Sequence, residues 1–261
     1  MKRMRYKLCF LAAMLATTHS YAITPVDVEL QLLVDISGSV NSTEYDLQMM
    51  GYSNAFASER VQDAIINGTE GSIAVQLIMW SGSGNQQVMI DWTLVDSADA
   101  AHDLSTVMAN IARPFSGWTA IGSAIEYGYP LFVNNDFAGT KNVIDISGDG
   151  TNNSGISPAA GSAAALANGV DTINGIVITT DDSVIDQYAE QVVGGDTPFL
   201  LAPATFNDFQ RAIENKIVAE IQGTTPQGAV PIPEPNISYI FSAALLLIWL
   251  KKQFGGSHEA S

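Results

Sequence analysis

The chain has 261 residues, of which 47% are hydrophobic and only 15% are charged, a composition that excludes an intrinsically disordered protein. Its formal net charge is −16, so its surface repels nucleic acid and anionic lipid and attracts divalent cations. We therefore predict no nucleic-acid partner and a single α/β domain of roughly 200 residues.

The first 22 residues have the pattern of a secretory signal peptide. A basic start precedes the apolar run Leu8–Ala16, which is too short to span a bilayer, and Ser20-Tyr21-Ala22 offers small residues at a cleavage site. We predict processing by signal peptidase, a mature chain that begins at Ile23, and export to the periplasm or cell surface of a Gram-negative bacterium. The only cysteine, Cys9, lies in this segment, which excludes disulfides and cysteine nucleophiles from the mature protein.

Strand-like and helix-like segments alternate through the middle of the chain. Asn41 and Glu44 form a capping-box pair at the start of a helix, and the glycine-rich turn at 81–85 joins two strands into a hairpin. In chain order, the predicted elements are a strand over Val28–Ile36, a helix after Asn41, strands over Ser72–Trp80 and Gln86–Trp92, helices over Ser97–Ala112 and Thr119–Phe132, a strand over Asn142–Ser147, a helix from Pro158 to Gly169, a strand over Ile173–Ile178, a helix over Ile185–Val193, a strand over Pro198–Leu201 and a helix over Phe206–Ile221.

This alternation predicts an α/β fold. Strands that alternate with helices of such length form a doubly wound, mainly parallel sheet with helices on both faces, and the hairpin adds one antiparallel edge strand. In such sheets, ligands bind beyond the carboxyl ends of the strands. We predict that this domain covers residues 23–222.

The C-terminal part has a different composition. Four prolines within Gly223–Pro235 predict a linker, and residues 236–261 contain the uncharged run Ile237–Leu250 followed by Lys251-Lys252. Fourteen helical residues reach only about 21 Å, against roughly 30 Å of hydrocarbon. This part of the chain resembles a PEP-CTERM sorting signal, because it combines Pro233-Glu234-Pro235 with the apolar run and the two lysines. The resemblance implies that an exosortase-like processing enzyme recognises the segment and removes it. A transmembrane anchor is the alternative interpretation, so membrane contact is either transient or permanent.

Three polar clusters fall where the fold predicts a binding site. Asp35-Ile36-Ser37-Gly38-Ser39 ends the first strand, Thr119 opens a helix, and Asp149 follows the strand 142–147. Alternate residues of an extended loop project to one side, so the Asp35 carboxylate and the two serine hydroxyls converge. Magnesium prefers about six oxygen ligands and keeps several waters. Because hydroxyls add no negative charge, a metal held this way can still accept a carboxylate from another molecule.

These residues resemble the metal-ion-dependent adhesion site of von Willebrand factor A domains, and the resemblance covers about Asp27–Ile221. Three segments are similar to those of an exported bacterial branch of this superfamily with no known function. They are Trp80-Ser81-Gly82, Trp118-Thr119-Ala120-Ile121-Gly122 and Ile146-Ser147-Gly148-Asp149-Gly150-Thr151-Asn152-Asn153.

The resemblance implies roles for the five residues. Ser37, Ser39 and Thr119 would contact the metal, while Asp35 and Asp149 would bind it directly or through water. The cofactor would be Mg²⁺, with Mn²⁺ or Ca²⁺ as alternatives. The function implied is metal-dependent adhesion to a protein or acidic matrix ligand through its carboxylate, without catalysis.

Several alternatives stay open at this point. Asp145 rivals Asp149 because Asp145-Ile146-Ser147-Gly148 repeats the pattern of the first loop, although Asp145 lies inside its predicted strand. Trp118 is a candidate ligand-binding residue at the rim of the site. A structural matrix component is the second functional hypothesis, with a metal site that only stabilises the fold. A hydrolase that uses His102 as its general base is the third.

Overall fold

The computed structural model describes residues 23–233, so the predicted signal peptide and most of the predicted sorting signal lie outside the described residues. Its elements are β1 (Thr24–Asp35), α1 (Ser42–Ala57), α2 (Glu59–Ile66), β2 (Ile73–Trp80), β3 (Gln86–Val95), α3 (Ala98–Ala109), α4 (Ile121–Gly128), the 3-10 helix η1 (Tyr129–Phe132), β4 (Phe137–Gly148), α5 (Pro158–Ala167), β5 (Thr172–Val177), α6 (Asp182–Gln191), β6 (Gly194–Gly195), β7 (Leu200–Leu201) and α7 (Phe206–Gln222).

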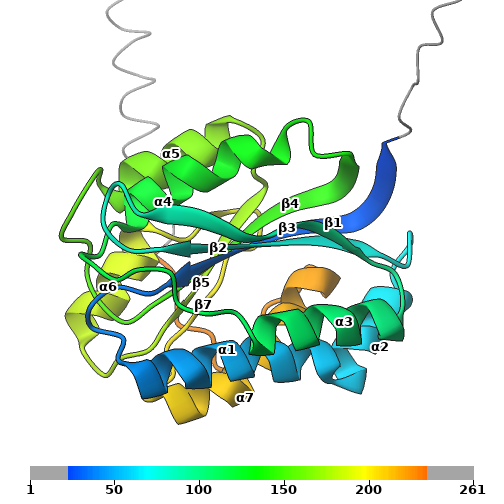
Figure 1. The fold of residues 1–261 in the computed structure, drawn as a ribbon. Helices are drawn as coiled ribbons and strands as arrows, with labels where there is room; N and C mark the ends of the chain where they lie inside the picture. Colours follow the sequence, from blue (N-terminus) through cyan, green and yellow to red (C-terminus); the bar gives the residue numbers. More distant parts are fainter. Residues whose placement is uncertain (1–22, 234–261) are drawn as a thin grey trace, which may run out of the picture.

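The strands form one mixed sheet in the order β3-β2-β1-β4-β5-β6, and β7 also pairs with β5 (Figure 1). β1 is parallel to both β2 and β4, and β5 is parallel to β4 and β7. β3 is antiparallel to β2, as the hairpin predicts. The doubly wound α/β class with an antiparallel edge strand is therefore confirmed. The two-residue strand β6, also antiparallel, is an addition that the sequence pattern did not indicate.

Helices cover both faces of the sheet, with α4 and α5 on one side and α1, α2, α3 and α7 on the other (Figure 1). Each face has its own apolar cluster, one including Leu30, Leu32 and Val34 and the other Leu33 and Ile146. Successive residues of a strand point to opposite faces, so a central strand covered on both sides must be apolar throughout. This requirement explains why most residues of β1 from Val28 to Val34 are apolar, although Glu29 and Gln31 are buried among them.

Local signals set several helix boundaries. The Asn41 side chain accepts hydrogen bonds from the N–H groups of Thr43 and Glu44, and the Glu44 carboxylate accepts one from the Asn41 N–H. The predicted capping box is therefore present. The predicted helix Thr119–Phe132 is shorter at its start, because α4 begins at Ile121, and its last turn is the 3-10 helix η1.

The helices α4 and α5 pack closely because glycines face one another. A Cβ atom built on Gly122 would lie 2.4 Å from the Ser157 carbonyl oxygen, and one on Gly161 would lie 2.6 Å from the Gly122 oxygen. Neither position has room for a side chain, since the contacting atoms belong to the main chain. This contact holds the segment that precedes α5 against the start of α4.

The chain after α7 folds back onto the sheet. Gly223 ends the helix in the left-handed conformation (φ 64°), and the Val230 N–H donates to the Leu200 carbonyl at 2.8 Å. Val230 thus forms an isolated antiparallel bridge with β7. Part of the predicted linker is therefore packed against the domain. Among the helices of residues 23–233, none is long and apolar enough to cross a bilayer.

Candidate metal site at the carboxyl ends of the strands

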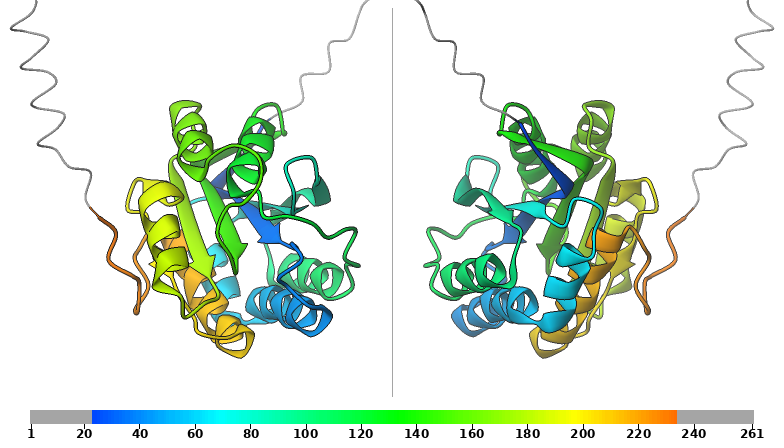
Figure 2. Two further views of the ribbon diagram at one scale, coloured as in Figure 1. Left: turned by 90° about the vertical axis from the view of Figure 1, so that its left-hand side faces the viewer. Right: turned by 90° about the vertical axis from the view of Figure 1, so that its right-hand side faces the viewer.

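The first loop of the site follows β1 directly, at the end of the sheet that faces the viewer in the left panel of Figure 2. The Asp35 Oδ1 atom accepts a hydrogen bond from the Ser37 N–H at 2.7 Å, and the Ser37 and Ser39 hydroxyls lie 3.1 Å apart. Asp35 and Ser37 are fully buried, whereas Ser39 is exposed. The alternation expected of an Asp-x-Ser-x-Ser loop therefore places three oxygen-bearing side chains in one hydrogen-bonded group.

Asp149 joins this group from the loop beyond β4. The Ser39 hydroxyl donates to the Asp149 Oδ1 atom at 2.5 Å. Asp145 lies inside β4 and is fully buried, with its Oδ1 atom 2.7 Å from the Lys216 ammonium of α7. Asp149, and not Asp145, is thus the carboxylate of this strand that contacts the first loop.

Lys216 also contacts Glu220 Oε1 at 2.5 Å, which makes a buried cluster of one ammonium and two carboxyl groups. Asn174 donates to the same Glu220 oxygen at 3.2 Å. Desolvation by burial raises the pKa of Asp145 and raises the pKa of Glu220 to about 8, with the neighbouring Asp145 charge as a second cause for Glu220. The cluster gives Asp145 a structural partner away from the candidate site.

Thr119 belongs to a segment that hydrogen bonds join to both the first loop and the third. The Gly38 N–H donates to the Gly117 carbonyl at 2.8 Å, which joins the first loop to the segment before Thr119. The Thr119 N–H donates to the Asn153 side chain at 2.8 Å, and the Thr119 carbonyl accepts from the Asn153 N–H at 2.9 Å. These bonds fasten the second loop to the third. Trp118 has 70% of its surface exposed.

The electrostatics of the group favour a cation. Burial, and then the charge of Asp149, raise the pKa of Asp35 to about 7. Burial also raises the pKa of Asp149, while the hydrogen bond from Ser39 lowers it. The second carboxylate oxygen of Asp35, Oδ2, is buried without a hydrogen-bond partner among residues 23–233. A buried unpaired carboxylate oxygen is costly unless a cation or a proton compensates it.

Arg113 organises the first loop, and the sequence patterns did not single it out. Its guanidinium donates to the carbonyl oxygens of Ile36, Ser37 and Val40, each at 2.7 Å. An arginine fork suits this task because its donors are planar and fixed. The sequence signal for Arg113 was its isolation, since it is the only lysine or arginine between Arg60 and Lys141 in a strongly acidic chain.

The donor set fits a hard divalent cation. Asp35 and Asp149 would supply carboxylate oxygens, and Ser37, Ser39 and Thr119 would supply hydroxyls. Oxygen donors of this kind suit magnesium, manganese and calcium. Within residues 23–233, no group of three or more histidine, cysteine, aspartate or glutamate side chains could hold a metal. A metal here would therefore depend on hydroxyls and waters for its remaining ligands, and these would add no further negative charge to the two carboxylates.

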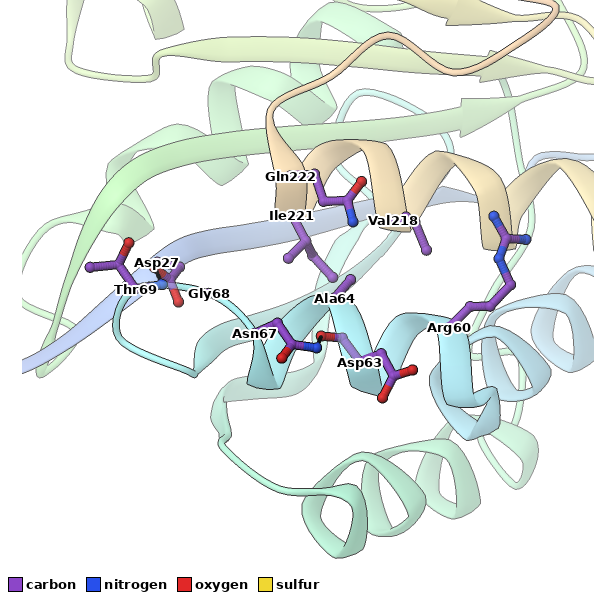
Figure 3. A pocket seen from close by; sticks show the side chains of 10 residues that line it. All are labelled: Asp27, Arg60, Asp63, Ala64, Asn67, Gly68, Thr69, Val218, Ile221 and Gln222. Carbon is purple, nitrogen blue, oxygen red and sulfur yellow. Dashed lines mark hydrogen bonds between the residues drawn. The ribbon is translucent and has the colours of Figure 1, made fainter.

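Two pockets differ in their relation to this group. One of about 360 Å³ adjoins Asp149 and is lined also by Glu44, Leu47 and Phe206, with the remaining walls from Ile178 and residues 204–207. The larger one, of about 640 Å³, lies between α2 and α7 (Figure 3). Its walls include Asp27 at the amino end of β1, so it lies away from the candidate ligands. Volume alone therefore does not locate the site.

His102, the base required by the hydrolase hypothesis, is exposed on α3. It follows the buried Ala101 and precedes the exposed Asp103 on the same helix. The segment 35–39, by contrast, follows β1, and its serines contact one another and Asp149.

Comparison with known proteins gives one family and one fold. A family model described as "Protein of unknown function (DUF1194)" matches residues 25–225. A search of curated protein sequences found no match.

Three solved structures resemble the chain. Proximal thread matrix protein 1 from the mussel byssus, solved with a zinc-occupied MIDAS motif (metal-ion-dependent adhesion site), is 17% identical, with a TM-score of 0.57 over 76% of this chain and 48% of that chain. The pilus adhesin SpaC from Lactobacillus rhamnosus GG in its open conformation is 15% identical, with a TM-score of 0.54 over 77% and 30%. A von Willebrand factor type A protein from Catenulispora acidiphila is 15% identical, with a TM-score of 0.50 over 75% and 43%.

This chain covers less than half the length of each of these three proteins. At such identities the likeness shows the fold alone, and that fold is the von Willebrand A fold.

Proposed function

We propose that this chain, which belongs to the protein family DUF1194 of unknown function, binds a divalent metal ion and uses it to hold a ligand without catalysis. The observation that carries the proposal is the convergence of Asp35, Ser37, Ser39 and Asp149 in one hydrogen-bonded group at the carboxyl ends of β1 and β4. The zinc-occupied MIDAS motif of the byssus protein supports it by analogy of fold.

The chemistry of the group explains why a metal would bind a partner here. When bound, the ion supplies a positive charge that attracts an anionic oxygen. Asp35 and Asp149 would hold the ion, while Ser37, Ser39 and Thr119 would orient around it without cancelling its charge. We therefore propose Mg²⁺, or alternatively Mn²⁺ or Ca²⁺, as the ion. The proposed ligand is a protein or acidic matrix component that offers a carboxylate.

The proposal includes an extracytoplasmic location. Export through the predicted signal peptide and processing at the PEP-CTERM-like segment would bring the domain to the cell envelope or surface. In this setting Trp118, exposed beside Thr119, is available to contact a ligand at the rim.

A thermal-shift measurement tests the metal site. An ion that binds only the folded state at about 100 times its Kd adds about 2.7 kcal/mol of stability. For a domain of this size, that corresponds to an increase in Tm of roughly 5–10 °C. We expect this increase with MgCl₂ in the wild-type protein and its loss in Asp149→Asn. Asp103→Asn, an exposed carboxylate on α3, is the matched control and should keep the increase.

Capture of a partner separates adhesion from a purely structural metal. Immobilised protein should retain a ligand from envelope or matrix extracts in Mg²⁺ and release it in EDTA. Ser39→Ala should weaken capture, whereas Thr69→Ala, an exposed hydroxyl beside the amino end of β1, should not. If the metal raises Tm but neither EDTA nor Ser39→Ala changes capture, the metal only stabilises the fold and the adhesion proposal is refuted. No metal effect on Tm would refute the metal site itself.

A further inference from the structure

A β-bulge interrupts the pairing of β2 with β3. The residues on either side of Gln76 pair with Thr93 and Ile90, so Gln76 lies opposite two residues, Asp91 and Trp92. Bulges redirect side chains and are over-represented beside functional sites. Here Gln76, Asp91 and Trp92 all line one pocket of about 430 Å³, a volume typical of small-ligand sites.

Another wall of this pocket is the segment 133–137, which leads from η1 into the first residue of β4. Asn134 (φ 61°) and Asp136 (φ 66°) adopt the left-handed conformation, which is uncommon outside glycine and is concentrated at binding sites. The intervening Asn135 is fixed by hydrogen bonds to the Glu29 carboxylate and the Phe137 N–H. Asn134 and Asp136 are exposed at the pocket, so their polar groups are accessible to a ligand.

A buried glutamine pair supports the floor of the pocket. The Gln31 Nε2 atom donates to Gln76 Oε1 at 2.8 Å and to the Gly128 carbonyl at 2.9 Å. This contact fixes the orientation of the Gln76 amide, whose Nε2 atom lies 3.5 Å from Asp91 Oδ1. Gln76 is only 2% exposed, and its long contact to Asp91 leaves donor capacity for a ligand. Gln31 and Gln76 lie in the central strands β1 and β2, where a buried polar side chain costs free energy unless it is hydrogen-bonded. A role of the Gln76 amide in ligand binding would explain why these strands contain the pair.

The aromatic wall is held rigid before any ligand arrives. The Trp92 indole N–H donates to the Leu131 carbonyl at 2.9 Å, and its ring centroid lies 5.1 Å from that of Phe132. A ring fixed in this way loses little conformational entropy when it contacts a ligand.

The lining selects a chemical class. It contains carboxylates, amides and aromatic rings but no lysine, arginine or histidine, so an anion would be repelled. An ammonium group could donate to Asp91 and Asp136, but it has no acceptor for the amide N–H groups of Gln76 and Asn134. A neutral polyol can donate to Asp91 and Asp136, accept from the amides, and place its C–H groups against Trp92. We propose that this pocket binds a neutral sugar residue, independently of the metal.

Titration of the purified, ¹⁵N-labelled protein with maltotriose or cellotriose tests the proposal. EDTA is present throughout, so the result does not depend on the metal site. We expect the Trp92 indole N–H resonance, assigned with Trp92→Phe, to shift with a Kd between about 10 μM and 1 mM. Spermidine and glucuronic acid serve as cationic and anionic probes and should leave the resonance unchanged.

Variants place the binding in this pocket. Asn134→Gly removes the amide but keeps the left-handed backbone, and it should weaken sugar binding at least about tenfold, equivalent to about 1.4 kcal/mol. Asn168→Gly, the same change at the exposed end of α5, should have no effect. The proposal is overturned if neither trisaccharide shifts the resonance at about 20 mM. It is equally overturned if spermidine or glucuronic acid binds there instead, or if Asn134→Gly leaves sugar binding intact.

Discussion

The substitution Lys216→Met measures how strongly the buried cluster of Asp145, Lys216 and Glu220 stabilises the fold. The Lys216 ammonium lies 2.7 Å from Asp145 and 2.5 Å from Glu220, and the side chains involved are fully buried. Removing one partner from a buried ion pair costs about 3–5 kcal/mol, because the remaining charge is uncompensated. Methionine keeps the length and packing of the lysine stem. We expect the free energy of unfolding at about pH 7.5 to fall by that amount.

The effect should depend on pH in a defined direction. Both carboxyl groups have pKa values raised in the folded protein, that of Glu220 to about 8. A raised folded pKa adds stability that is fully present below the unfolded pKa and is lost as pH rises through the folded pKa. For Glu220 the window lies between about pH 4.3 and pH 8. Without the ammonium, both carboxyl groups bind protons more readily, so the loss in Lys216→Met should shrink at about pH 5.

Urea denaturation at the two pH values, followed by circular dichroism, gives the free energies. Arg60→Met is the matched control. Arg60 pairs with Glu214 at 2.9 Å but is 60% exposed, so its loss should cost less than about 1 kcal/mol. The double variant Lys216→Met/Glu220→Gln should regain part of the stability, since one uncompensated charge is gone. A loss below about 1 kcal/mol for Lys216→Met at both pH values would refute the reasoning.

Two further predictions concern the site and the α4–α5 contact. Arg113→Lys keeps the charge but cannot reproduce the planar set of donors that binds the carbonyls of Ile36 and Ser37. It should therefore reduce the Mg²⁺-induced rise in Tm. An unchanged rise would show that the guanidinium does not position the first loop for the metal. Gly122→Ala places a Cβ atom 2.4 Å from a main-chain oxygen and should lower the free energy of unfolding by about 1–3 kcal/mol in urea titrations. Gly84→Ala, where a Cβ atom meets nothing within 4 Å, is its control, and equal effects of the two would contradict the close packing.

Features with a local signal could be predicted from the sequence. The capping box at Asn41 and the hairpin across 81–85 depend on neighbouring residues, and both are present. The positions of Asp35 at the end of a strand, and of Ser39 and Asp149 beyond strand ends, followed from apolar runs that stop where the polar residues start. The structure brings Ser39 into contact with Asp149, and Ser37 links Ser39 to Asp35, because the carboxyl ends of adjacent parallel strands share one end of the sheet.

Features that depend on distant residues could not be predicted. Arg113 donates hydrogen bonds to main-chain carbonyls of the first loop. Because every residue has such a carbonyl, no residue type in the loop indicates that Arg113 would bind there. The ion pair of Asp145 with Lys216 is of the same kind, because only the packing of α7 on the sheet brings them together. The bulge opposite Gln76 also escaped prediction, because the extra residue of β3 is defined only by its pairing with β2 and not by its own residue type.

The edges of the sheet determine how easily copies of this protein can aggregate through strand pairing. An edge strand with free main-chain groups is a template on which other chains can aggregate. Here β3 is interrupted by its bulge, β6 is only two glycines long, and Val230 already bonds to β7. Within residues 23–233, the edge at β3 is irregular, and the edge at β6 and β7 is short or already paired. Main-chain pairing between copies, the kind of contact that leads to fibrils, is therefore disfavoured at these edges.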